Sequence, residues 1–188
     1  MNPSINDLRM FWWVFAVRGG LAFIFGIVLF FASIFLGIFF FDPVTLVYIS
    51  LLLGSFVLGN GLLLGIAAGF AYEHQLHLWW LMLCECCFAV LLGVYIGLSL
   101  IMTRESLAFL AGLHALGAGL FQEALAVKLR KDSPNAYLLG LTGVVSLGLG
   151  VWFFVHVHQA ARTTTQALSA FELFCALCWV SLSLRLRN

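Results

Sequence analysis

Six long apolar segments make up most of this chain, and short polar breaks separate them. They run near residues 11–41, 45–71, 78–102, 106–127, 136–157 and 166–184. A helix needs about 20 apolar residues to cross the hydrocarbon core of a bilayer. The segments therefore predict an all-α integral membrane protein with six transmembrane helices in a single domain over residues 1–188. Because the connections are short, successive helices are expected to run antiparallel.

The composition excludes a water-soluble protein. Hydrophobic residues make up 63% of the chain and charged residues only 9%, whereas soluble domains carry about 25% charged residues. The solvent must therefore be the lipid bilayer, which is the expected partner. The net charge of +1 provides no basic surface for nucleic acid, and no nucleic-acid partner is expected.

An internal repeat groups the six segments into three parallel helical hairpins. The hairpins cover residues 11–71, 78–127 and 136–184. Arg18 in the first matches Glu85 in the second at an offset of 67, and Glu85 matches Thr142 in the third at 57. The second helices of the first two hairpins match at 58, so the first hairpin has about nine extra residues near Ile34–Phe41. Its first helix must therefore tilt, kink or project from the membrane.

Basic residues in the loops predict the orientation. One side carries Arg9, Lys128, Arg130, Lys131, Arg185 and Arg187, and the other carries Arg104 and Arg162. Short loops rich in Lys and Arg remain in the cytoplasm. Both termini are therefore expected to be cytoplasmic.

Charged residues inside membrane spans are expensive to bury and mark functional candidates. Arg18 and Glu85 lie at the same distance from the start of their spans, and Glu123 approaches that depth from the other direction. The three predict a buried charge cluster in the cytoplasmic leaflet. A guanidinium and a carboxylate would form an ion pair that fixes helix register, or a site at which Glu85 titrates against Arg18. Both interpretations remain open.

Further polar residues lie within the predicted spans. They are Asn60, His114, Gln122 and Glu172. Asn60 is expected to make an interhelical hydrogen bond, and Glu172 is expected near the outer end of the sixth helix, within reach of water. His156 and His158, at the outer end of the fifth helix, are candidate pH-sensing groups because imidazole titrates near pH ~6.5.

Glycines predict where helices approach closely. Gly61, Gly65 and Gly69 recur every four residues on one face of the second helix, and such faces let helix backbones pack in lipid. We expect this face to close the bundle within one chain; joining two subunits in a homo-oligomer, or a membrane-protein partner, is the alternative.

Motifs for catalysis are missing from the sequence. It contains no phosphate-binding glycine loop, no HExxH metal motif and no G-x-S-x-G nucleophile elbow, which are the usual signatures of such sites. The chain is therefore not expected to be an enzyme, and no catalytic residue, cofactor or metal is predicted. The five cysteines lie in apolar runs and are expected to act as small packing residues.

The ordered set of motifs resembles the HdeD-like acid-resistance membrane proteins of bacteria. The motifs are Trp12-Trp13, Arg18-Gly19 and Gly26; Trp79-Trp80, Glu85 and Gly93; Gly119-Leu120-Phe121-Gln122 and Lys128-Leu129-Arg130; and Ser183-Leu184-Arg185-Leu186-Arg187. The chain departs from the family pattern at Cys86, where the family has Gly, and at Asn60 and Gln122, where it often has Asp and Glu. The resemblance implies a small bacterial inner-membrane protein that contributes to acid or envelope stress tolerance.

Two other functions are compatible with the sequence. One is a small channel or transporter for protons or a small solute. The other is a scaffold that binds another membrane protein through the face of Gly61, Gly65 and Gly69.

Overall fold

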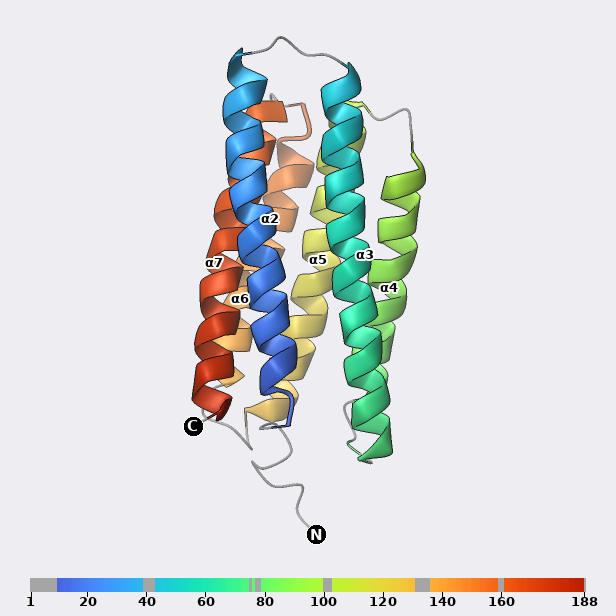
Figure 1. Cartoon of the computed structure of the whole chain (residues 1–188), viewed down its shortest axis with the longest axis vertical. Helices are drawn as coiled ribbons and strands as arrows, with labels where there is room; N and C mark the ends of the chain where they lie inside the picture. Colours follow the sequence, from blue (N-terminus) through green and yellow to red (C-terminus); the bar gives the residue numbers. More distant parts are fainter. Residues whose placement is uncertain are drawn as a thin grey trace.

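The computed structural model describes residues 10–38, 43–74, 76, 79–99, 103–130, 136–158 and 161–187. This part of the chain contains six α-helices: α2 (Trp12–Ile38), α3 (Pro43–Glu73), α4 (Trp79–Leu98), α5 (Arg104–Leu129), α6 (Ala136–Val155) and α7 (Ala161–Arg187). All six are long and apolar enough to cross a membrane. They stand side by side in one bundle (Figure 1). The predicted all-α fold of six transmembrane helices is confirmed.

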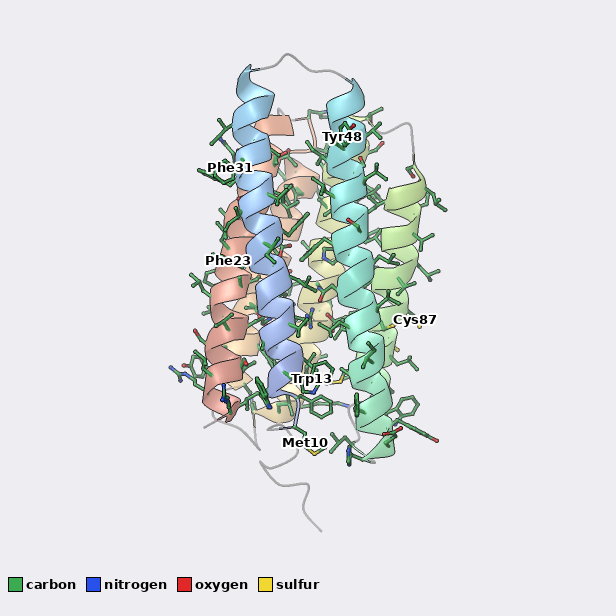
Figure 2. The ribbon with its side chains drawn as sticks, viewed as in Figure 1. Met10, Trp13, Phe23, Phe31, Tyr48 and Cys87 are labelled. Atoms are coloured by element: carbon green, nitrogen blue, oxygen red, sulfur yellow. The ribbon has the colours of Figure 1, made fainter. Side chains whose placement is uncertain are left out.

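The outer surface of the bundle is apolar. Figure 2 shows Phe23, Phe31 and Tyr48 pointing away from the helices, and all three side chains are exposed. Several polar side chains, by contrast, are buried between the helices, including Arg18 and Glu85. A surface of this kind is stable against lipid tails and unstable against water. The helices therefore bury their polar faces and present their apolar faces to the bilayer.

The helices pack most extensively in three pairs, which are α2 with α7, α3 with α4, and α5 with α6. Glycines allow these close approaches. A Cβ atom on Gly93 of α4 would lie 2.7 Å from the backbone nitrogen of Leu58 and 3.0 Å from the carbonyl oxygen of Gly54 in α3. A Cβ atom on Gly150 of α6 would lie 3.0 Å from the carbonyl oxygen of Gly112 in α5. Any side chain at these positions would separate the backbones.

Serine hydroxyls add hydrogen bonds across two of the close pairs. Ser169 of α7 donates to the carbonyl oxygen of Gly26 in α2 at 2.8 Å, and Ser146 of α6 donates to that of Ala115 in α5 at the same distance. Each serine is buried. Since lipid offers no competing hydrogen bonds, such contacts help to hold the paired backbones together.

The close pairs differ from the predicted hairpins. The predicted hairpins joined α2 to α3, α4 to α5 and α6 to α7, and these neighbours contact each other less extensively than the close pairs do. The physical reason is the position of the small residues, because the glycines of α2, α4 and α6 face α7, α3 and α5. The first and last helices of the chain therefore pack together and close the bundle.

The extra length of the first hairpin appears as a projection. The helix α2 has 27 residues and α3 has 31, whereas α4 and α6 have 20 each. The joined ends of α2 and α3 extend beyond the other helices (Figure 1). Whether the first helix tilts, kinks or projects from the membrane stays a prediction; residues 39–41 of the predicted insert lie outside the described residues.

The glycine face of α3 packs within the chain. A Cβ atom on Gly61 would lie 3.0 Å from the Cβ atom of Ala89, and one on Gly65 would lie 2.9 Å from the sulfur of Cys86. Both of these neighbours belong to α4. Gly69 has no such neighbour within 4 Å in the described part of the chain. Two of the three glycines thus close the bundle, as expected.

The glycine contact at Gly93 predicts a large effect of one methyl group. Gly93→Ala should lower the free energy of unfolding by about 1–3 kcal/mol, as overpacking does in closely packed interiors. The matched control is Gly97→Ala on the same helix, where an added Cβ atom meets nothing within 4 Å, so that the change should be neutral or slightly stabilising. Unfolding in detergent measures both. Equal unfolding free energies for the two variants would contradict the close packing.

Candidate functional site

Arg18 and Glu85 form a buried salt bridge inside the bundle. The Nη2 atom of Arg18 donates to Oε1 of Glu85 at 2.9 Å, and the two residues are 3% and 5% exposed. Each is the seventh residue of its helix, α2 or α4. Both helices run in the same direction, so the two side chains have the same depth. The predicted pairing of these charges is confirmed.

Trp179 of α7 completes the surroundings of the guanidinium. The Cζ atom of Arg18 lies 4.5 Å from the centre of the Trp179 ring, within the range of a cation–π contact. Sequence reasoning missed this residue. A tryptophan within an apolar run gives no signal that separates one stacked on a cation from one that faces lipid.

A small cavity between the helices lies next to the salt bridge. Its polar lining consists of Arg18, Asn60, His114, Gln122, Ser146, Glu172 and Trp179. These side chains come from α2, α3, α5, α6 and α7, so that the cavity lies where the close pairs meet. Its volume is about 10 Å³, which is room for about one water molecule.

Unpartnered polar atoms are concentrated in this cavity. Within the described residues, the buried atoms without a hydrogen-bond partner include Arg18 Nε, Asn60 Oδ1, His114 Nδ1, Gln122 Oε1 and Trp179 Nε1. All five residues line the cavity and are less than one-tenth exposed. More than about 90% of buried polar groups in proteins have a partner, so this cluster is a candidate binding site for a small polar ligand. The oxygen of Asn60 thus faces the cavity and lacks the interhelical bond that we expected.

Glu172 is deeper than the sequence indicated. It was expected near the outer end of its helix and in reach of water, but it is only 2% exposed and lines the cavity. The helix α7 begins at Ala161, five residues before the predicted start of the span. This extra length places Glu172 near the middle of α7 and brings it into the same site as Arg18 and His114.

Glu123 does not join Arg18 and Glu85. Its side chain packs against α6, where a Cβ atom on Gly143 would lie 2.7 Å from Glu123 Oε1. Its neighbour Gln122 lines the cavity instead. Successive residues of an α-helix point about 100° apart, so Gln122 and Glu123 cannot both face the centre. The prediction that Glu123 belongs to the charge cluster is therefore wrong.

The two histidines at the end of α6 lie apart from the cavity. The Nδ1 atom of His156 is 3.0 Å from the carbonyl oxygen of Trp152, and its ring stacks on that of Trp152. His158 is exposed. A role for His156 and His158 in pH sensing stays a prediction.

Metal binding and similarity to known proteins give no further information about this site. The described residues contain no group of three or more His, Cys, Asp or Glu side chains that could hold a metal ion. Comparison of the chain with protein-family models, curated proteins and solved structures found no match. The buried polar cavity beside the salt bridge is therefore the candidate functional site.

The salt bridge predicts non-additive mutations. Arg18→Met alone should lower the free energy of unfolding by about 3–5 kcal/mol, because it leaves a carboxylate buried without its partner. The double variant Arg18→Met, Glu85→Leu removes both charges and should lose less. Unfolding of Arg18→Met, Glu85→Leu and the double variant in detergent measures the coupling between the two residues. Additive losses of unfolding free energy would show that the two residues do not stabilise each other.

Proposed function

We propose that the chain is a small non-enzymatic protein of the bacterial inner membrane, of the HdeD-like kind, that contributes to acid or envelope stress tolerance. The observation that carries this proposal is the small polar cavity between the helices, which is lined by the buried residues Arg18, His114 and Glu172. The resemblance of the motifs to the HdeD-like proteins supports the same function.

The salt bridge acts as a register lock in this proposal. Arg18 comes from α2 and Glu85 from α4, and each charge would be costly to bury without the other. The pair therefore favours one relative position of the two helices. The titratable groups beside the pair, His114 and Glu172, can change the charge of the cavity and so couple this arrangement to acid.

An internal threefold repeat is part of the proposal. Phe56, His114 and Glu172 are each separated by 58 residues, and all three line the cavity. The glycine contact between α3 and α4 recurs between α5 and α6 at offsets of 58 and 57. Equivalent positions of three repeats would meet on their common axis, which places the cavity on that axis.

The two other candidate functions have less support. A transporter for a small solute needs room for that solute, whereas this cavity has a volume of only about 10 Å³. A scaffold that used the glycine face of α3 would need that face free, whereas Gly61 and Gly65 pack against α4.

The same end of the bundle that holds the start of α2 and the end of α7 (Figure 1) is proposed to face the cytoplasm. Cations stack on aromatic rings there: Lys128 on Trp80, Arg185 on Tyr137, and Arg187 on Trp12. Aromatic and basic residues of this kind gather at the membrane–water interface, and the basic residues favour the cytoplasmic side.

This orientation predicts the outcome of reporter fusions. A reporter fused to the C-terminus should be active only if it works in the cytoplasm, because of the excess of basic residues at that end. A fusion after His158, in the segment between α6 and α7, is the matched control and should be active only if the reporter works outside. The reverse pattern would overturn the orientation.

An acid-shock experiment tests the function itself. A strain that lacks the gene would carry wild type, Glu85→Gln or an empty vector, with the two proteins at equal membrane levels. Wild type should keep the cytoplasmic pH closer to neutral and increase survival. Glu85→Gln should protect less, because Arg18 loses its carboxylate partner.

Glu73→Gln, at the exposed end of α3, controls for the loss of a carboxylate as such and should protect like wild type. Wild type that protects no better than the empty vector would refute the proposed function.

A further inference from the structure

We propose that the cavity is a binding site for one proton together with one water molecule, and that Glu172 is the residue that carries the proton. This inference rests on the proposed function, since it names the ligand through which the site would respond to acid. It also differs from the expectation that Glu85 is the titrating group.

The balance of charges around the cavity indicates that Glu172 carries the proton. Arg18 is the cation that lines the cavity, and two buried carboxyl groups, Glu85 and Glu172, lie in its surroundings. Arg18 donates directly to Glu85 at 2.9 Å, whereas Glu172 has no hydrogen bond or ion pair within the described residues. If both carboxyl groups were ionised, the site would hold one uncompensated negative charge inside the membrane. Binding one proton removes that charge.

The neighbours of Glu172 offer few other acceptors for this proton. The helix α2 contributes Arg18, and α5 contributes His114. The helix α6 contributes Ser146 and α3 contributes Asn60, neither of which titrates. On α7 itself, the thiol of Cys175 is buried about one turn away. Among the described residues that line the cavity, His114 is therefore the base that can share the proton with Glu172.

The remaining polar atoms select water as the second ligand. Arg18 Nε and Trp179 Nε1 each carry a hydrogen that has no acceptor, and Asn60 Oδ1 and Gln122 Oε1 are acceptors without a donor in the described chain. An anion would satisfy only the N–H groups, and a metal cation would satisfy only the oxygens. Water both donates and accepts, and the volume of about 10 Å³ suits one molecule.

Infrared difference spectroscopy of the full chain in lipid nanodiscs tests the proton. The carbonyl stretch of a protonated carboxyl group is measured while the pH is raised from acidic to alkaline. Wild type should show one such band that persists at neutral pH and shifts in D₂O. Glu172→Gln should abolish it, while the exposed control Glu73→Gln should retain it. Because Glu85→Gln would leave one carboxyl group for one cation, Glu85→Asp is used instead; it keeps the charge and should leave the band at its wild-type frequency.

A band that survives in Glu172→Gln, or that moves to the frequency of an aspartic acid in Glu85→Asp, would overturn the assignment. Glu172→Gln keeps the shape of the side chain and removes no observed hydrogen bond, so it should fold; its unfolding in detergent checks this. A band that shifts when Na⁺ replaces choline in the buffer would indicate a metal-cation site and would also contradict the proposal.

A second infrared measurement on the same samples tests for the bound water. Exchange into H₂¹⁸O should shift an O–H stretching band in wild type, and Gln122→Leu, which removes one acceptor, should eliminate that band. A wild-type spectrum without an isotope-sensitive band would exclude the bound water.

The two proposals can fail separately. If the Glu172 band is found but wild type gives no protection in acid shock, the proton site stands and the stress function fails. If wild type protects and the band is absent, the stress function stands and the proton site fails.

Discussion

The ion pair between Arg18 and Glu85 connects parts of the bundle that glycine packing alone would leave separate. Arg18 belongs to the close pair of α2 and α7, and Glu85 belongs to the close pair of α3 and α4. The guanidinium also stacks on Trp179, so that one cation contacts groups from three helices. Water cannot compensate either charge in this environment, and the two pairs must therefore keep the relative position that the contact requires.

Glycine packing and the polar cavity depend on each other. Close approach of paired backbones, as at Gly54 with Gly93 and at Gly112 with Gly150, brings the helices together within each pair. Larger side chains then fill the space between pairs, and the polar ones among them meet at the centre. His114 and Gln122 reach the cavity from α5, and Asn60 reaches it from α3. The cavity is thus a consequence of how three tight pairs surround a common centre.

The sequence was sufficient for the six spans and for the Arg18–Glu85 contact. Long apolar runs have one stable solution in a membrane, and opposite charges at one depth within such runs must find each other. It was not sufficient for the helix partners, because a glycine face shows that a backbone approaches closely but not which one. It also misplaced Glu172, since a helix that starts five residues earlier changes the depth of every residue in it. The stacking of Trp179 on Arg18 leaves no pattern in the sequence.

The close pairing of α2 with α7 has a consequence for how the protein is made. Of the six described spans, the first to be translated carries Arg18, and the last carries its aromatic neighbour Trp179. Synthesis proceeds from the N-terminus, so Arg18 enters the bilayer before either Glu85 or Trp179 has been translated. The glycine face of α2, at Gly19 and Gly26, stays uncovered until α7 arrives. The close pair of α2 is therefore complete only when α7 has been translated, and a chain that ends before α7 presents an open face and a poorly shielded cation to membrane quality control.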